Sequence, residues 1–182
     1  MDKYQLKINK PLLIYGSPGS GKTYLAEYLL KDSVLLKIDA SHLKNTSDLK
    51  ENILNKIKKR NITLMFSEKK PTHGILIDDI HIFNTYDKKN FKNIISFIKD
   101  NLFYNSKIVL VCNKSFIKNK DLVKCKLNKL ECKYSYTQYY KICLKMCENK
   151  NLNLDVIDNK IYKSNYNLNV FLSECDDFND SF

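Results

Sequence analysis

The chain has 182 residues, of which 43% are hydrophobic, and it carries a formal net charge of +11 at pH 7. This length accommodates one α/β domain and a small appendage, and the hydrophobic content suffices for a packed core. No apolar run reaches the roughly 20 residues of a membrane helix, and the N-terminus lacks the form of a signal peptide. We therefore expect an intracellular protein, cytoplasmic or nuclear, and exclude a membrane-bound or secreted one.

The composition also bears on partners and compartment. Arg60 is the sole arginine, so the positive charge is almost all lysine. Such a charge favours either a solvated lysine-rich surface or contact with a nucleic acid backbone. The abundance of Asn, Ile and Lys is typical of an AT-rich genome, such as that of a large DNA virus. The 6 cysteines include no Cys-x-x-Cys pair, which favours buried thiols in a reducing compartment over a metal site.

The first predicted elements are a buried strand over Leu12–Tyr15 and a helix over Thr23–Leu30. Between them lies a phosphate-binding loop of the form Gly-x-x-x-x-Gly-Lys-Thr, which reads Gly16-Ser17-Pro18-Gly19-Ser20-Gly21-Lys22-Thr23. Its glycines let backbone N–H groups approach phosphate oxygens at the N-terminal end of the helix dipole. We expect Lys22 to bind the β- and γ-phosphates and Thr23 to bind Mg²⁺. The nucleotide-binding segment is predicted to extend to Tyr24.

The middle of the chain continues the alternation of strands and helices. A strand over Val34–Ile38, a helix from Ser47 to about Arg60 and a loop from Ile62 to Pro71 are predicted. The apolar run Ile75–Asp78 is predicted as a strand that is buried on both faces of a parallel sheet. Further predictions are a helix over Asp87–Leu102, a strand over Lys107–Cys112, a short helix near Asp121–Lys124 and a weak strand around Lys126–Cys132.

This alternation predicts an α/β fold, a P-loop NTPase with a doubly wound parallel sheet and helices on both faces. No further strand is expected beyond Ser135, where apolar stripes predict helices around Tyr139–Met146, Leu154–Tyr162 and Leu168–Leu172. We expect a nucleotide-binding domain over 1–134, a small helical lid over 135–175 and an acidic tail over 176–182. Ligands of such sheets bind at the carboxyl ends of the strands, so the loop, Asp78 and Asn113 are expected to converge.

Two further segments are candidates for the same site. Gly74, the only glycine outside the loop, opens Gly74-Ile75-Leu76-Ile77-Asp78-Asp79. There Asp78 would lie next to Mg²⁺, and Asp79 could activate a water for attack on the γ-phosphate. Asn113, which ends the next strand, could orient that water or sense the γ-phosphate. The plainer interpretation is a solvated Asp-Asp turn and an Asn turn residue.

With these segments the chain resembles the AAA+ ATPases over about residues 10 to 175. Ile14 to Thr23 is similar to their Walker A motif, Ile75 to Asp79 to Walker B, and Cys112-Asn113 to sensor 1. The C-terminal helices resemble the AAA+ lid. The resemblance implies ATP and Mg²⁺ as ligands, with Lys22, Asp79 and Asn113 in catalysis.

Within the AAA+ ATPases, the chain looks most like clamp loaders, especially the large subunit of replication factor C. Ile38-Asp39-Ala40-Ser41 and Ser47-Asp48-Leu49-Lys50 are similar to two segments of that subunit, and Val111-Cys112-Asn113 is similar to a third. Leu122-Val123-Lys124-Cys125 lies where the small subunits carry Ser-Arg-Cys, which holds their arginine finger. Lys124 occupies the arginine position, and lysine cannot form the same planar clamp.

Two other positions depart from the family pattern. The lid segment Asn165-Tyr166-Asn167-Leu168 has no sensor 2 arginine, and Asn167 is near its place. Walker B ends in Asp79 where Glu is usual, as it also does in bacterial replication initiators. The resemblance thus implies an ATPase of DNA replication that works with other AAA+ subunits, DNA and a sliding clamp, and whose hydrolysis depends on a partner's arginine.

Three alternatives remain open at this point. The chain could be an ATP-binding structural subunit with little hydrolysis, which the missing arginines favour. It could be an ATPase that resembles helicase loaders or initiators. A small P-loop kinase is disfavoured, because such enzymes hold the transferred phosphate with several lid arginines.

Overall fold

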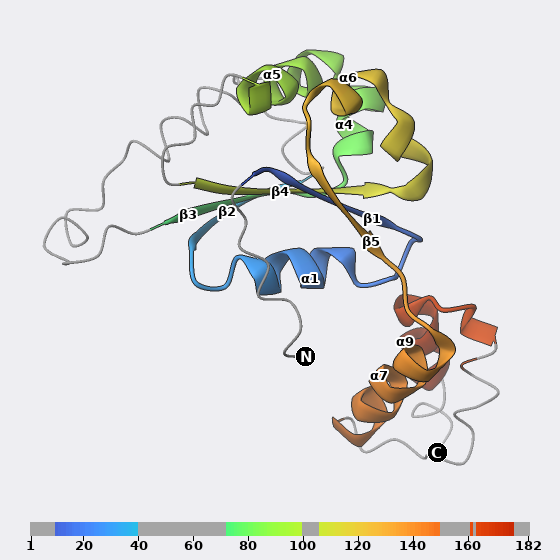
Figure 1. The fold of residues 1–182 in the computed structure, drawn as a ribbon. Helices are drawn as coiled ribbons and strands as arrows, with labels where there is room; N and C mark the ends of the chain where they lie inside the picture. Colours follow the sequence, from blue (N-terminus) through green and yellow to red (C-terminus); the bar gives the residue numbers. More distant parts are fainter. Residues whose placement is uncertain (1–9, 40–71, 100–105, 150–160, 162, 177–182) are drawn as a thin grey trace, which may run out of the picture. The chain divides into compact units, whose positions relative to one another are not determined.

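The computed structural model describes residues 10–39, 72–99, 106–149, 161 and 163–176. Five strands form one sheet in the order β2-β3-β4-β1-β5 (Figure 1). Their bounds are Leu12–Gly16 for β1, Val34–Ile38 for β2, His73–Ile77 for β3, Ser106–Asn113 for β4 and Asn128–Cys132 for β5. Strand β3 lies between β2 and β4 and pairs in parallel with both, and Ile77 at its end lies opposite Ile38 and Leu110. The predicted parallel α/β sheet is therefore confirmed.

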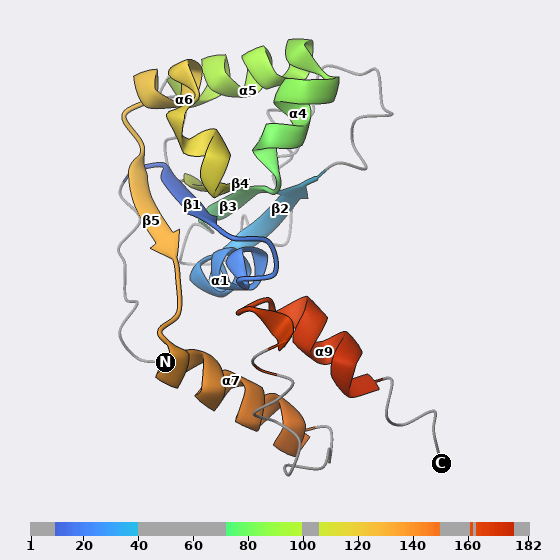
Figure 2. The same ribbon diagram turned by 90° about the vertical axis from the view of Figure 1, so that its right-hand side faces the viewer.

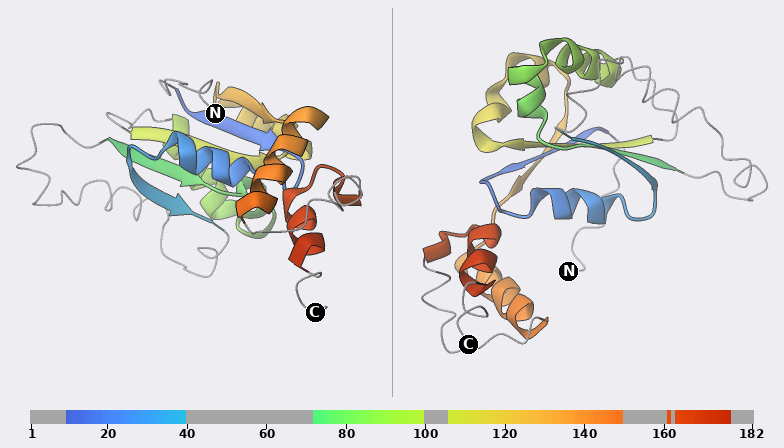
Figure 3. Two further views of the ribbon diagram at one scale, coloured as in Figure 1. Left: turned by 90° about the horizontal axis from the view of Figure 1, so that it is seen from below. Right: turned by 180° about the vertical axis from the view of Figure 1, so that it is seen from behind.

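Helices cover both faces of this sheet (Figure 2). Helix α1 (Lys22–Leu29) lies along the strands on one face, as Figure 3 shows from below. Helices α4 (Ile80–Tyr86), α5 (Lys88–Lys99) and α6 (Lys120–Lys124) lie on the other face. A 3₁₀ helix, η2 (Lys114–Lys118), connects β4 to α6. Strands β3 and β4 are apolar on both faces because helices cover both faces of the sheet.

The main core lies between the sheet and α4 and α5. Ile75 and Ile77 of β3, Leu110 of β4 and Phe97 of α5 are fully buried in it. Helix α5 turns Phe91, Ile94, Ile95 and Ile98 toward this core, and all four are buried. Each such side chain contributes about 1.5–3 kcal/mol through burial, so this core fixes the end of β3 from which the site residues project.

Gly74 has a packing role within the main unit. A Cβ at this position would lie 3.0 Å from the Ser33 Cβ and 3.2 Å from the Leu30 Cδ2. Glycine in β3 therefore lets the end of α1 and the turn after it approach the sheet closely. Because Gly74 is three residues before the end of the strand, the structure accounts for this glycine by helix packing and not by contact with a ligand.

The helix predicted over Asp87–Leu102 is α5, as far as that stretch is described. Helix α4 precedes it and was not predicted, because a seven-residue helix with two buried residues, Ile80 and Phe83, gives a short apolar period. Asp87 separates α4 from α5, and its carboxylate accepts hydrogen bonds from the backbone N–H and the side-chain amide of Asn90. This cap explains why α5 begins where the sequence predicted a helix start.

Contacts divide the chain into two compact units, one of Met1–Tyr15 and Thr23–Leu130 and the other of Gly16–Lys22 and Glu131–Phe182. In the second unit, α7 (Tyr136–Asn149) and α9 (Leu168–Asp176) lie side by side (Figure 2). They share an apolar cluster that includes Tyr139, Cys143 and Phe171. The Tyr139 hydroxyl also hydrogen-bonds the Ser164 hydroxyl at 2.9 Å. The phosphate-loop segment thus belongs to the same unit as the C-terminal helices.

Several predictions concern residues that the structure does not describe. These are the helix from Ser47 to Arg60, the loop from Ile62 to Pro71, most of the helix over Leu154–Tyr162 and nearly all of the acidic tail. Among the described helices, none combines the length and the apolar character that crossing a bilayer requires.

Candidate nucleotide-binding site

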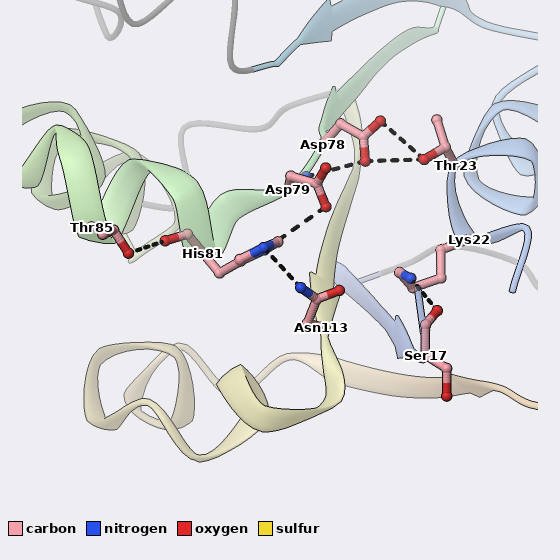
Figure 4. Close-up of polar contacts among 8 residues, drawn as sticks. All are labelled: Ser17, Lys22, Thr23, Asp78, Asp79, His81, Thr85 and Asn113. Carbon is pink, nitrogen blue, oxygen red and sulfur yellow. Dashed lines mark hydrogen bonds and ion pairs between the residues drawn. The ribbon is translucent and has the colours of Figure 1, made fainter. Parts of the chain in front are cut away.

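A hydrogen bond joins the first turn of α1 to the end of β3. The Thr23 hydroxyl lies 3.1 Å from Oδ1 and 3.0 Å from Oδ2 of Asp78, and it donates to this carboxylate (Figure 4). Thr23 comes from the helix that follows the glycine loop, whereas Asp78 follows a strand 55 residues further along the chain. The structure therefore brings together the two side chains that the sequence assigned to Mg²⁺. Hydroxyl and carboxylate oxygens are the ligands that this ion takes from proteins.

The carboxyl of Asp78 lies in an environment that disfavours its charge. Burial raises the pKa of Asp78, and the neighbouring Asp79 raises it further, whereas the hydrogen bond from Thr23 and the charge of Lys37 lower it. The net effect is a pKa above the ordinary value of 3.8. A divalent cation would supply the missing compensation, so the residues present fit a magnesium site.

The glycine loop is closed by hydrogen bonds to the Ser17 carbonyl. Lys22 Nζ donates to this oxygen at 2.6 Å and the Ser20 hydroxyl donates to it at 2.8 Å. Gly19 and Gly21 have φ of 67° and 74°, values that glycine adopts without a steric cost. Lys22 is only 7% exposed, and its ammonium donates to a neutral carbonyl. A buried ammonium that is bonded to a neutral oxygen is suited to binding phosphate.

Residues far along the chain contact this loop within the second unit. The Cys132 thiol donates to the Ser20 carbonyl at 2.9 Å, and the backbone N–H of Leu168 donates to the Gly19 carbonyl at 2.9 Å. The Asn167 amide occupies the space where a Cβ of Gly19 would lie. Asn167 Oδ1 also accepts from the backbone N–H groups of Asn169 and Val170, so it caps α9. Helix α9 therefore begins against the loop.

A second polar cluster lies at the ends of β3 and β4. His81, in the first turn of α4, has its Nε2 atom 2.9 Å from Nδ2 of Asn113. Its Nδ1 atom is 3.8 Å from Oδ1 of Asp79 (Figure 4). Asp79 has φ of 48° and ψ of 46°, the left-handed conformation that Asp tolerates better than most residues. At this residue the chain leaves β3 and α4 begins. The Asp79 carboxylate, the His81 imidazole and the Asn113 amide therefore form one cluster.

His81 is a residue that the sequence reasoning missed. The only signal was its place three residues after Asp78, and no motif marks it. Asn167, Cys132 and the contacts around the loop were also invisible, since they depend on packing between segments that are distant in sequence.

The remaining predicted residues lie in less enclosed places. Ser17 and Pro18 are exposed at the tip of the loop, and Gly16 is buried at its base. Tyr24 is 62% exposed on α1. Lys124 is exposed at the end of α6, and Arg60 lies outside the described residues.

The fold and this geometry define a class of protein. A parallel sheet, a glycine loop between strand and helix, and a helix threonine bonded to a strand-end carboxylate are the features of a P-loop nucleotide-binding protein. Residues 12–127 match the model of the ATPase family associated with various cellular activities (AAA). This match covers more than half of the sequence, and the chain belongs to that family.

Solved structures give the same fold. The Orc1 protein of Aeropyrum pernix, in complex with DNA, matches with a TM-score of 0.66 and 18% identity over 90% of this chain and 52% of its own. The RuvB Holliday junction branch migration motor of Thermotoga maritima matches with a TM-score of 0.62 and 17% identity, over 91% of this chain and 53% of its own. The chain thus spans about half the length of these proteins. A sequence search of curated proteins finds no match.

Proposed function

We propose that the chain is an AAA+ module that binds ATP with Mg²⁺ and hydrolyses it in DNA replication, with a clamp-loader-like action. The observation that carries this proposal is the hydrogen bond between Thr23 and Asp78, at 3.0 Å to Oδ2. These two side chains would hold a Mg²⁺ ion, which would supply positive charge against the negative charge that develops during phosphoryl transfer. A chance motif would not bring a loop threonine onto a strand-end carboxylate.

The roles of the other residues follow from this arrangement. The backbone of Gly16–Gly21 would bind phosphate oxygens, with Tyr24 at the edge of the segment, and Lys22 would move from the Ser17 carbonyl to the β- and γ-phosphates. Asp79 would accept the proton of the attacking water, and Asn113 would orient that water. The C-terminal helices over 135–175 would act as the lid that closes on the nucleotide.

Hydrolysis on this proposal needs an arginine from a partner. Arg60 is the only arginine of the chain, and the positions that resemble the arginine finger and sensor 2 hold Lys124 and Asn167. Lysine lacks the planar fork of arginine, and Asn167 carries no charge. Arginine fingers raise turnover by about 10³–10⁵ in related NTPases, so the chain alone should hydrolyse ATP slowly.

The partners proposed are other AAA+ subunits, DNA and a sliding clamp, inside the cell and not at a membrane. Support for DNA comes from the net charge of +11 and from exposed lysines, which include Lys114, Lys118, Lys120, Lys124 and Lys126. The names of the two similar structures point the same way, because one is bound to DNA and the other acts on Holliday junctions. The resemblance to the replication factor C large subunit suggests clamp loading, and the abundance of Asn, Ile and Lys suggests an origin in a large DNA virus.

The test is ATP turnover by the purified chain alone, with primed DNA, with arginine-finger AAA+ subunits of its source, and with both. We expect stimulation only by the combination. Asp79→Asn is the control, and it should lower stimulated turnover by about 10²–10⁴ while ATP binding is kept. Several turnovers per second by the chain alone would contradict the dependence on a partner.

A second candidate is an ATP-binding structural subunit that hydrolyses little. The absence of arginine at the two positions favours it. If Asp79→Asn assembled on DNA and supported replication as well as the wild type, this candidate would replace the first. Preference for duplex DNA over a primer–template junction would instead indicate a helicase loader or an initiator-like ATPase.

A further inference from the structure

The hydrogen bond between His81 and Asn113 constrains where the imidazole proton lies. The side-chain nitrogen of Asn113, Nδ2, carries two hydrogens and only donates, and it lies 2.9 Å from His81 Nε2. With the amide in this orientation, Nε2 accepts through its lone pair and the ring proton lies on Nδ1. This tautomer is fixed by a partner on β4 and not by the helix on which His81 lies.

The other ring nitrogen faces the carboxylate proposed as the base. Nδ1 is buried and has no hydrogen-bond partner among the described residues, and the Asp79 Oδ1 atom lies 3.8 Å from it. An N–H in this place attracts the carboxylate without neutralising it. The Asp79 side chain remains 47% exposed, so it keeps access to water.

The imidazole ring is itself held by packing. Its centroid is 6.2 Å from that of Phe116 in η2, and Phe116 meets Phe91 of α5 edge to face at 6.0 Å. The His81 carbonyl accepts from the Thr85 hydroxyl at 3.1 Å within α4. Elements α4, α5, β4 and η2 thus fix the ring, which makes it a rigid link between Asn113 and Asp79.

We propose that His81 is a positioning residue for ATP hydrolysis, because it sets which end of the Asn113 amide faces the reaction and holds Asp79 nearby. With Nδ2 bound to His81, Asn113 presents Oδ1 on the opposite side (Figure 4). An oxygen there accepts one hydrogen of the attacking water while Asp79 accepts the other. A flipped amide would present N–H groups, which cannot orient the water in this way. The inference rests on the hydrolysis proposed above.

Three variants test this role. His81→Leu removes both nitrogens and keeps an apolar side chain against Phe116. His81→Gln restores an oxygen that can accept from Asn113 and an N–H that can donate to Asp79. His73→Gln is the matched control, because His73 lies at the opposite end of β3. Hydrolysis is measured as single-turnover decay of labelled ATP with excess chain and the stimulating partners, and ATP affinity is measured separately with a fluorescent analogue.

We expect His81→Leu to lower the single-turnover rate about 10- to 100-fold, as loss of a supporting hydrogen-bond partner does in other sites, with little change in ATP affinity. His81→Gln should recover most of the rate, and His73→Gln should match the wild type. A wild-type rate in His81→Leu, together with a rate lost in Asp79→Asn, would overturn this inference and leave the proposed function standing. No turnover in the wild type under any condition would overturn both.

A second measurement needs no hydrolysis and no variant that folds poorly. Nitrogen NMR of the imidazole rings distinguishes the two neutral tautomers, and the chain has 3 histidines to assign. His81 should carry its proton on Nδ1, whereas free histidine prefers Nε2. A proton on Nε2 of His81 would overturn the inference, whatever the turnover.

Discussion

The strand ends of the sheet and the C-terminal helical unit contribute differently to the candidate site. At the strand ends lie the proposed site residues Asp78, Asp79 and Asn113, and each has a polar neighbour in Thr23 or His81. In the helical unit the contacts with the glycine loop are neutral ones, made by Asn167, Leu168 and Cys132. The groups proposed for the reaction thus lie at the sheet, whereas these contacts of the C-terminal helical unit with the loop involve no charged group.

This difference separates two steps of the proposed reaction. Binding of a metal–nucleotide complex would rely on the glycine loop and on Asp78. Acceleration of phosphoryl transfer would rely on positive charge near the γ-phosphate, and Arg60 is the only arginine of the sequence.

The largest expected effect is a loss of ATP affinity, which tests the proposed role of the glycine loop in binding. Lys22→Ala removes the buried ammonium that would bind phosphate, so ATP affinity should fall at least about 100-fold, the scale of a charge-assisted hydrogen bond. Titration with a fluorescent ATP analogue measures it. Lys92→Ala, on the exposed face of α5, is the matched control and should leave affinity unchanged. Equal affinities in the two variants would show that the site is elsewhere.

A smaller effect tests the contact between the helical unit and the loop. Asn167→Ala removes the side-chain cap of α9 and the amide packed over Gly19, so the unfolding free energy should fall by about 1 kcal/mol. Asn169→Ala changes the same residue type two positions along the helix, where no cap is lost. Thermal denaturation should separate the two, and hydrogen exchange should show faster opening of α9 only in Asn167→Ala.

The charge of Asp78 gives a pH-dependent prediction. Since its pKa is raised in the folded chain, folding favours the protonated form, and stability is lost as pH rises from the ordinary value of 3.8 through the higher folded value. Asp78→Asn keeps an acceptor for Thr23 and lacks this loss. The variant should therefore be slightly more stable than the wild type at neutral pH without Mg²⁺, by less than about 1 kcal/mol because water screens the group.

Melting temperatures of both chains between about pH 4 and 7 check this sign. Saturating Mg²⁺ and ATP should stabilise the wild type and not Asp78→Asn, because only the wild type binds the ion. A wild type that gains stability over the variant as pH rises in the absence of Mg²⁺ would contradict the prediction.

The smallest effect is expected at a surface pair outside the site. Lys37 Nζ lies 2.8 Å from Glu27 Oε1, and both side chains are substantially exposed. Glu27→Gln should cost about 0.2–1 kcal/mol at low ionic strength and less in high salt. Urea denaturation at two salt concentrations measures it. A loss independent of salt would mean that Glu27 supports α1 through packing and not through charge.

The sequence was sufficient where chemistry is local. The strand before the loop, the helix after it and the strand that ends before Asp78 were predicted within about two residues, because apolar runs and glycine placement act over short distances. The contact of Thr23 with Asp78 followed from the rule that parallel strands present their carboxyl ends together. By contrast, α4 was missed, because the left-handed conformation of Asp79 that begins it leaves no sequence pattern.

The surroundings of the site were beyond prediction for a related reason. His81 meets Asn113 across 32 residues, and Cys132 meets Ser20 across 112. Such pairs depend on how strands and helices pack, and the sequence around each residue does not indicate its partner. The clamp-loader resemblance likewise came from short segments, two of which include residues that the structure does not describe.

The hydrogen bond from the Leu168 backbone N–H to the Gly19 carbonyl links the start of α9 to the glycine loop, so the position of α9 can report on the loop. If the proposed ATP binding displaces the Gly19 carbonyl, the first turn of α9, which is bonded to it, should move as well. Val170, 38% exposed one turn beyond Asn167, offers a position for a fluorophore. A signal there that follows ATP addition, and is absent in Lys22→Ala, would let nucleotide occupancy be read in real time without any turnover.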